Sequence, residues 1–201
     1  MTNFYRRYIL PPLLDRAMSD RRISHYRRPV LAPASGRILE IGFGTGANLS
    51  HYPESVQQLE IVEPDVALNV RARRRLEKSS REVIVHALSA EQLPFDTASF
   101  DTVVSTFTLC SIPDVESALR EVHRVLKPGG QFLFLEHGLS PDSSVARWQH
   151  RLTPIQKVIG GGCHLDRPMR SLIERAGLNI ESAGYEERYA PKLPKVVAWL
   201  S

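Results

Sequence analysis

The feature of this chain that most constrains its fold is an apolar run that ends in closely spaced glycines. Residues 38–46 read Ile-Leu-Glu-Ile-Gly-Phe-Gly-Thr-Gly, with glycines at positions 42, 44 and 46. A buried strand followed by such glycines lets the backbone turn sharply and approach a ligand with no side chain in between. We therefore expect an α/β protein with a ligand-binding turn after its first strand.

The rest of the chain alternates between strand-like and helix-like segments, which is typical of a mainly parallel sheet with helices on both faces. The seven predicted strands are 37–41, 59–63, 83–87, 100–106, 131–136, 178–186 and 196–200. Predicted helices begin at 47–51 and cover 66–78, 115–126 and 169–176. A chain of 201 residues fits a single domain, 1–201, with a cap helix at 1–28 and a substrate-side insertion at 138–168.

The distribution of charged and apolar residues limits the binding partners and the cellular location to be expected for this protein. Arginines crowd residues 1–28 and 71–75, within a net charge of +4. Such runs suit an anionic membrane surface, a nucleic acid or an acidic substrate, or form a solvated helix face. Aromatic residues are not interleaved with the second run, so we expect no nucleic-acid partner. No stretch approaches the roughly 20 apolar residues that span a bilayer, and 1–20 does not resemble a signal peptide, which favours a cytoplasmic enzyme.

The two cysteines, Cys110 and Cys163, are too few and too far apart in sequence for a disulfide framework or a zinc site. We expect reduced thiols and no metal. Their predicted role is to line a pocket and not to act as nucleophiles.

Three features favour S-adenosylmethionine as the ligand of the glycine turn. The spacing is G-x-G-x-G, whereas dinucleotide enzymes use G-x-G-x-x-G to place a pyrophosphate on a helix. Glu40 precedes the turn, where a carboxylate can engage the ammonium group of a methionine moiety, directly or through water. Glu63 closes the second predicted strand, where it can accept both ribose hydroxyls. The alternative is a purely structural glycine turn, with two surface carboxylates that bind no ligand.

In order and spacing, five stretches resemble the class I S-adenosylmethionine-dependent methyltransferases that have a ubiquinone/menaquinone C-methyltransferase type of core. They are 38–46, 61–65, 90–95, 99–105 and 121–130. The resemblance implies a Rossmann-like fold. Two positions depart from the family pattern, because Phe43 replaces a small residue or cysteine and Ser89 replaces an aspartate.

The resemblance also implies a cofactor site, residue by residue. On the methionine side it implies Glu40, Gly42, Gly44, Gly46 and Thr106, with Phe107 behind. Glu63 is implied at the ribose and Pro64 near the adenine, while Ser89, Ala90 and Glu91 are implied at the adenine edge. Ordinary packing at a strand end is the alternative role for Thr106 and Phe107.

Outside the core, the chain is similar to small thiol S-methyltransferases and to bacterial phospholipid N-methyltransferases. The matching segments are 3–8, 11–15, 109–113, 135–137 and 162–167. This similarity implies methyl transfer to a small-molecule thiol, leaving S-adenosylhomocysteine. The alternatives are N-methylation of phosphatidylethanolamine or another small amine, and a non-catalytic module that only binds the cofactor. The basic N-terminus also suits peripheral contact with an anionic membrane.

Four residues are candidates for the chemistry. His137 follows the fifth predicted strand, at the sheet edge where ligands bind, and is the first candidate for a base or substrate-orienting group. His164 is the second, with Asp166 to orient it. Tyr5 and Tyr8 are predicted to close over the cofactor, where their rings favour the sulfonium charge. Each residue also has a structural alternative, in packing or in loop stabilisation.

Overall fold

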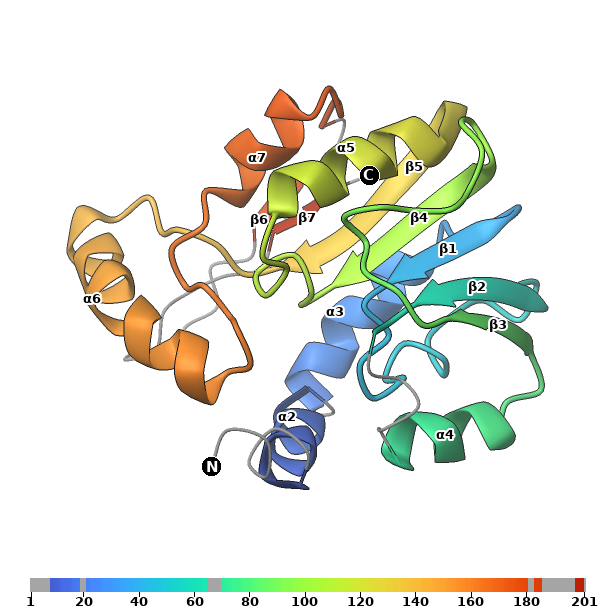
Figure 1. Cartoon of the computed structure of the whole chain (residues 1–201), viewed down its shortest axis with the longest axis horizontal. Coiled ribbons are helices and arrows are strands. Elements are labelled where there is room, and N and C mark those ends of the chain that lie inside the picture. Colours follow the sequence, from blue (N-terminus) through green and yellow to red (C-terminus); the bar gives the residue numbers. More distant parts are fainter. Residues whose placement is uncertain (1–7, 19–20, 65–69, 181–182, 186–197, 201) are drawn as a thin grey trace.

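The computed structural model describes residues 8–18, 21–64, 70–180, 183–185 and 198–200. A seven-stranded sheet runs through the middle of the molecule in the order β3-β2-β1-β4-β5-β7-β6 (Figure 1). The strands are β1 Ile38–Ile41, β2 Gln58–Val62, β3 Glu82–His86, β4 Phe100–Thr106, β5 Leu126–Glu136, β6 Ala183–Tyr185 and β7 Ala198–Leu200. The helices are α2 Leu10–Met18, α3 Arg21–Leu31, α4 Val70–Glu77, α5 Val115–Val125, α6 Ser143–Ile159 and α7 Met169–Arg175.

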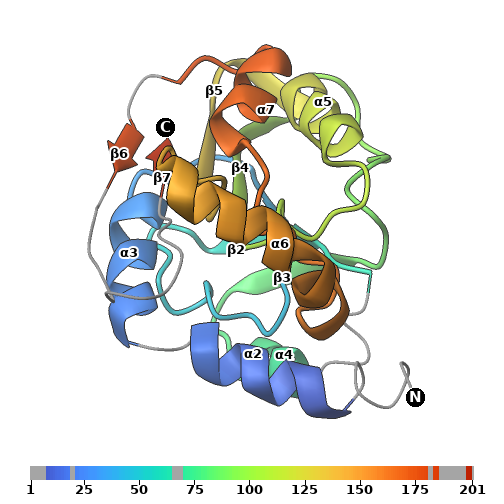
Figure 2. The ribbon, with the colours of Figure 1, turned by 90° about the vertical axis from the view of Figure 1, so that its left-hand side faces the viewer.

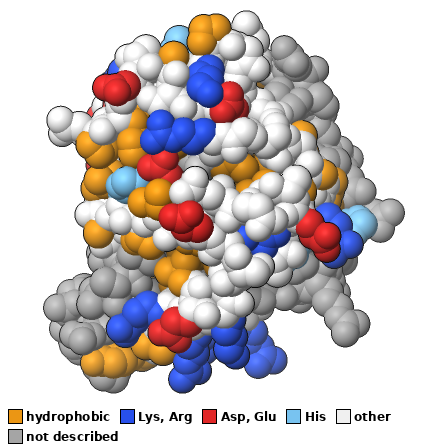
Figure 3. Space-filling model, turned by 90° about the vertical axis from the view of Figure 1, so that its right-hand side faces the viewer, with side chains coloured by type: hydrophobic (Ala, Val, Ile, Leu, Met, Phe, Trp, Pro, Cys, Tyr) orange, Lys and Arg blue, Asp and Glu red, His pale blue; other side chains and the backbone are white. Residues whose placement is uncertain are grey.

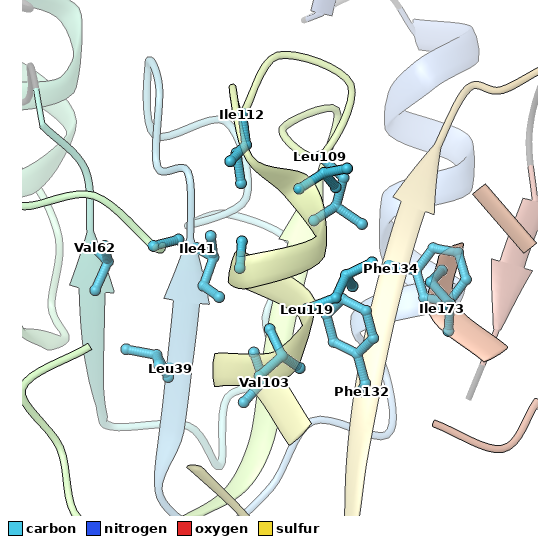
Figure 4. Packing of buried hydrophobic residues seen from close by; sticks show 14 of the residues in the cluster. Leu39, Ile41, Val62, Val103, Leu109, Ile112, Leu119, Phe132, Phe134 and Ile173 are labelled. Atoms are coloured by element: carbon cyan, nitrogen blue, oxygen red, sulfur yellow. The ribbon is translucent and has the colours of Figure 1, made fainter. Parts of the chain in front are cut away.

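Strand β5 shows why the sheet has a core on each face. Successive side chains of a strand point to opposite faces. Phe134 therefore packs with Leu119 of α5 and Ile173 of α7 (Figure 4), whereas Leu133 belongs to the core cluster that contains Leu31 of α3. The expected arrangement, an α/β sheet covered on both faces, is confirmed.

The order of the strands determines where a ligand binds. Strands β1 to β5 are parallel, while β7 runs antiparallel to β5. Strand β1 pairs with β2 on one side and with β4 on the other, so the chain direction along the sheet reverses there. Ligands of open α/β sheets bind in the crevice outside the carboxyl ends of the strands at such a switch point. Gly42, Glu63 and Phe107, which follow these three strands, meet at this edge.

Residues 47–51 are predicted to begin a helix, but they form a series of turns. Their backbone bonds span three residues, as in His51 N to Asn48 O at 2.8 Å. The side chain of Asn48 is committed to a buried network, described below, and Pro53 lacks the N–H that a continuing helix requires. These local constraints override the helical pattern.

Other boundaries also differ from the prediction. Strand β5 begins at Leu126 rather than at Gln131, because the backbone becomes extended directly after α5, and its pairing with β4 shifts register between Phe100 and Thr102. In place of the single cap helix predicted within 1–28, the described residues of this segment form the α-helices α2 and α3, of which α3 continues to Leu31. The helix predicted at 66–78 is described from Val70 onward.

The longest described helix, α6, lies within the predicted insertion 138–168. Asp142 caps its start by accepting the Ser144 N–H at 2.7 Å, and Gly160 ends it. The sequence pattern hides this helix because its large apolar residues are exposed to solvent, on the surface or in the cavity, whereas only Gln149 and Thr153 are buried. Figure 2 shows α6 in front of the strand ends, where it covers the ligand edge of the sheet.

Candidate cofactor and acceptor site

A cavity of about 920 Å³ opens at the carboxyl ends of β1, β2 and β4. The site residues predicted from the sequence that line it are Gly42, Gly44, Glu63, Pro64, Ser89, Ala90, Thr106, Phe107 and His137. Glu40, Gly46, Glu91, His164 and Tyr8 are described but do not line it, and Tyr5 lies outside the described residues. Helix α6 supplies much of the opposite wall.

The three glycines of the turn differ in what they make possible. Gly42 has φ +76°, and a Cβ there would lie 2.0 Å from Thr108 Oγ1, so only glycine lets the loop after β4 pack this closely. A Cβ at Gly46 would lie 2.7 Å from the Phe43 ring. Apart from Gly44 itself and its two chain neighbours, no described atom lies within 4 Å of a Cβ built on Gly44, which has φ +53° and lines the cavity. Gly42 and Gly46 therefore serve packing, and Gly44 leaves room for a ligand.

Glu40, predicted to engage the methionine ammonium directly or through water, is buried and does not line the cavity. Its side chain is 1% exposed and accepts hydrogen bonds from Asn48 Nδ2 at 3.0 Å and Tyr52 OH at 2.7 Å. Burial raises its pKa to about 7, although these bonds and the charge of Arg27 oppose the rise. Glu40 thus holds Asn48 and Tyr52 behind the cavity wall, and its contact with the methionine ammonium stays a prediction.

The sequence analysis missed Arg27, which it counted among the N-terminal surface arginines. Arg27 is buried, lines the cavity, and donates through Nη1 to Thr106 Oγ1 at 2.8 Å and to Asn48 Oδ1. Burial lowers its pKa, and the nearby charge of Glu40 raises it in opposition. Nothing in the sequence separates Arg27 from its neighbour Arg28, which is exposed.

Two acidic residues at the cofactor edge have different tasks. Glu63 Oε2 accepts the Gly44 N–H at 2.8 Å and so links the end of β2 to the glycine turn. Glu91 accepts the Ser89 hydroxyl and the Asp114 N–H, each at 2.7 Å. Glu91 therefore braces the loop that presents Ser89 and Ala90, whereas Glu63 stands in the cavity wall.

Glu136, the last residue of β5, is a second site residue that the sequence analysis missed. One carboxylate oxygen accepts the Thr108 N–H at 2.6 Å and the Leu109 N–H at 2.8 Å. Its burial raises the pKa of the carboxyl group. These bonds hold the loop after β4, in which Phe107 adopts a φ of +53°. The signal in the sequence was an acid that closes an otherwise apolar strand.

Beyond this loop, Cys110, His137 and Cys163 meet in the cavity wall. His137 Nε2 lies 3.1 Å from Cys163 Sγ. Burial opposes a charged imidazole, but the bond to Cys163 and the charge of Glu136 prevail and raise the pKa of His137. Hydrogen bonding from Cys110 lowers the pKa of Cys163. The fold thus joins two cysteines whose separation in sequence argued against a shared site.

Known proteins resemble both the core and nearly the whole chain. A family model described as a methyltransferase domain matches residues 39–134. The human thiol S-methyltransferase TMT1B is 32% identical over 205 residues, which cover 98% of this chain and 80% of that protein. The chain belongs to the class I S-adenosylmethionine-dependent methyltransferases.

Two further comparisons define how far this likeness extends. The rat thiol S-methyltransferase TMT1B is 39% identical over 145 residues, covering 69% of this chain but only 58% of the rat protein. An S-adenosylmethionine-dependent methyltransferase from Thermotoga maritima superposes with a TM-score of 0.64 at 23% identity, covering 100% of this chain and 92% of that chain. The solved structure shows that the methyltransferase fold extends over the chain.

The cavity of this methyltransferase fits S-adenosylmethionine, the cofactor of the family. Gly44 leaves its backbone open to the cavity, and the Glu63 carboxylate stands at the end of β2, where hydroxyl groups can be bound. Pro64 and Ala90 offer apolar surface beside it for an aromatic base. The ligand contacts of these residues remain predictions.

The remaining candidates of the methyltransferase hold loops or lie apart from the cavity. The backbone N–H of His164 donates to Cys110 O at 2.9 Å, and His164 Nδ1 lies 3.2 Å from the same oxygen. Asp166 is predicted from the sequence to orient His164. It pairs instead with His150, whose Nδ1 lies 2.8 Å from Asp166 Oδ2. Tyr8 is 57% exposed ahead of α2.

Proposed function

We propose that this protein transfers a methyl group from S-adenosylmethionine to the thiol of a lipophilic small molecule. The observation that carries the proposal is that the Cys110–His137–Cys163 cluster lines the same cavity as three apolar side chains of α6. These are Leu152, Ile155 and Ile159, and the same helix adds the polar Gln149 and Gln156 to the lining. Such a pocket accepts an apolar body and directs one polar atom toward the cluster. The thiol S-methyltransferases among the relatives support a sulfur acceptor.

The chain's own groups would align the two reactants and exclude water, which supplies most of the rate in such a displacement. When bound, S-adenosylmethionine supplies a methyl group on a positively charged sulfur. The Arg27–Asn48–Thr106 network and the glycine turn would fix the donor end of the cavity. His137 would orient the acceptor sulfur, because it lines the cavity directly after β5 with its Nε2 3.1 Å from Cys163 Sγ.

Helix α6 supports a lipophilic acceptor. Leu152, Ile155 and Ile159 line the cavity and are also 40%, 58% and 49% exposed, so the pocket wall continues onto the surface. Trp148 and Val158 extend this apolar face, with exposed Arg147, Arg151 and Lys157 along the same helix. Apolar faces that carry tryptophan beside basic residues are typical of helices that lie in a membrane interface.

We therefore propose a cytoplasmic protein whose α6 face and N-terminal basic residues contact an anionic membrane peripherally. No described helix is both long enough and apolar enough to cross a membrane. The second arginine run, 71–75, lies on α4 and not on α6. Figure 3 shows basic side chains gathered at the lower edge of the molecule, where Figure 1 places α4. There Arg71 and Arg75 pair with Asp15 of α2 at 3.1 and 2.7 Å.

The test of the acceptor is a labelled-methyl assay against alkyl thiols, phenols, primary amines and phosphatidylethanolamine. We expect transfer to long-chain alkyl thiols and weaker transfer to short polar ones. If methyl groups are transferred only to phosphatidylethanolamine, this lipid amine, and not a thiol, is the acceptor. Binding of S-adenosylmethionine without transfer to any acceptor would favour a non-catalytic module.

The test of the membrane contact is co-sedimentation with phosphatidylcholine vesicles that contain or lack phosphatidylglycerol. We expect binding to the anionic vesicles, and a loss of several-fold in the W148E/V158E variant. V70E, which changes an exposed valine of α4, is the matched control. Equal binding of both variants would rule out the α6 face.

A further inference from the structure

Three metal-binding side chains converge at the acceptor end of the cavity, each from a different segment. Among the described residues, Cys110, His137 and Cys163 form one group whose ligand atoms all lie within 4.8 Å of one another. We propose that this group binds a zinc ion whose fourth position takes the sulfur of the methyl acceptor. This inference rests on the proposed thiol methylation, and its test separates the two.

The spacing of the ligand atoms suits a tetrahedral ion. Bonds of about 2.3 Å to sulfur and about 2.0 Å to nitrogen place tetrahedral ligand atoms roughly 3.5–3.8 Å apart. His137 Nε2 and Cys163 Sγ, at 3.1 Å, are slightly closer than this, as expected for a pair that shares a proton instead of a metal. Because all three ligand atoms already lie within 4.8 Å of one another, small side-chain rotations are sufficient to bring them to these distances.

Each ligand is held by structure that does not depend on the metal. Cys110 follows Leu109, whose N–H is bound by Glu136 at 2.8 Å, and His137 directly follows β5. Cys163 ends the Gly160–Gly162 turn that stops α6. The His164 N–H donates to Cys110 O at 2.9 Å and so fixes the two cysteine-bearing loops to each other. Supported ligands of this kind are characteristic of a preorganised site.

The donor set selects the kind of ion and leaves one position free. Two thiolates and an imidazole favour zinc or another soft divalent ion over magnesium or calcium, which prefer oxygen. Two thiolates also balance the charge of a divalent cation. All three ligands line the cavity, and no fourth histidine, cysteine or carboxylate joins the group among the described residues. Three protein ligands with an open position are the pattern of catalytic zinc sites.

The open position explains how a buried, lipophilic thiol would become a nucleophile. A thiol that coordinates zinc loses its proton, here to water at the cavity mouth, and remains bound as a thiolate. Its lone pair forms the new sulfur–methyl bond, while the bond from methyl to the sulfonium sulfur breaks and leaves its electron pair on that sulfur. The zinc keeps its oxidation state. The neutral thioether product is a weaker ligand than the thiolate and can leave.

The test uses the full chain, purified without chelator or metal-affinity resin, and then exchanged with cobalt(II). We expect about one zinc per chain by mass spectrometry, and in the cobalt form an intense near-ultraviolet thiolate band with visible bands of a tetrahedral ion. An added alkyl thiol should shift these bands in the absence of S-adenosylmethionine. C110S, C163S and H137A should each lower zinc affinity at least tenfold. H150A, which changes an exposed histidine of α6, is the matched control.

A wild-type chain that binds no zinc or cobalt at micromolar concentration would overturn the proposal. The same holds if C163S gives the same thiolate band as the wild type. Full thiol methylation by metal-free protein would refute the zinc site and leave the proposed function standing. A normal cobalt spectrum in a protein that methylates only amines would refute the proposed function and leave the metal site standing.

Discussion

The two halves of the cavity are built in different ways. The cofactor half comes from strand ends that lie side by side, because Gly42 directly follows β1, Glu63 directly follows β2 and Thr106 ends β4. The acceptor half combines the loop after β4, the end of β5, α6 and the Gly160–Gly162 turn. A parallel sheet thus fixes the donor site through its topology, whereas the acceptor site depends on loops and one helix that can vary without changing the fold.

The largest effect that separates the halves is expected from the glycine turn. Gly42→Ala places a Cβ 2.0 Å from Thr108 Oγ1 at a φ of +76°, so steric overlap and backbone strain add. We expect a loss of about 2–5 kcal/mol in unfolding free energy, measured by urea denaturation. Gly44→Ala is the contrast, because its Cβ enters open cavity space. Only the backbone strain at φ +53°, about 1–2 kcal/mol, should lower its stability, and cofactor binding should weaken. Equal destabilisation by both variants would contradict this division of roles.

Glu40 provides a pH-dependent test of the support beneath the cofactor half. Its carboxyl group binds its proton more tightly when folded, with a pKa of about 7 against 4.5. The folded state therefore carries more protons between these values, and stability falls as pH rises from about 4.5 to 7. Relative to Glu40→Gln, the wild type should lose on the order of 3 kcal/mol over this range. A constant difference between the two proteins from pH 5 to 8 would show that Glu40 is ionised throughout.

Glu63 tests the predicted ribose contact. Removing a carboxylate that binds hydroxyl groups costs about 1.5–3 kcal/mol, so Glu63→Ala should weaken S-adenosylhomocysteine binding by roughly tenfold to a hundredfold in calorimetry. The KM for the acceptor should change little. Glu54→Ala, which removes an exposed acid outside the cavity, is the control. Unchanged affinity in Glu63→Ala would remove this residue from the cofactor half.

The smallest expected effect belongs to the acceptor half alone. Ile155 lines the cavity, while Val158, one turn further along α6, does not. Ile155→Asp should raise the KM for an alkyl thiol about three- to tenfold, because a charge replaces apolar pocket surface, and leave cofactor affinity unchanged. Val158→Asp should change neither constant in assays without membranes. Matching KM values for the two variants would place the acceptor elsewhere.

The difference between the cofactor half and the acceptor half also determines how much of each could be predicted from the sequence. The glycine turn, Glu63 and Thr106 are close to strands in sequence, so their meeting follows once a parallel sheet is assumed. Arg27 could not be assigned, because its burial depends on how α3 packs against the sheet. The Cys110–His137–Cys163 group was missed for a similar reason, since it requires the unforeseen helix α6 to return the chain to the end of β5.

The most direct measurement is competition between acceptors in one reaction. Purified protein, S-adenosylmethionine and equimolar octanethiol and octylamine are incubated, and the products are identified by mass spectrometry. The account predicts methyl octyl sulfide and S-adenosylhomocysteine in equal amounts, with no methylated amine. N-methyloctylamine as the main product would contradict the assignment of the acceptor half to a thiol.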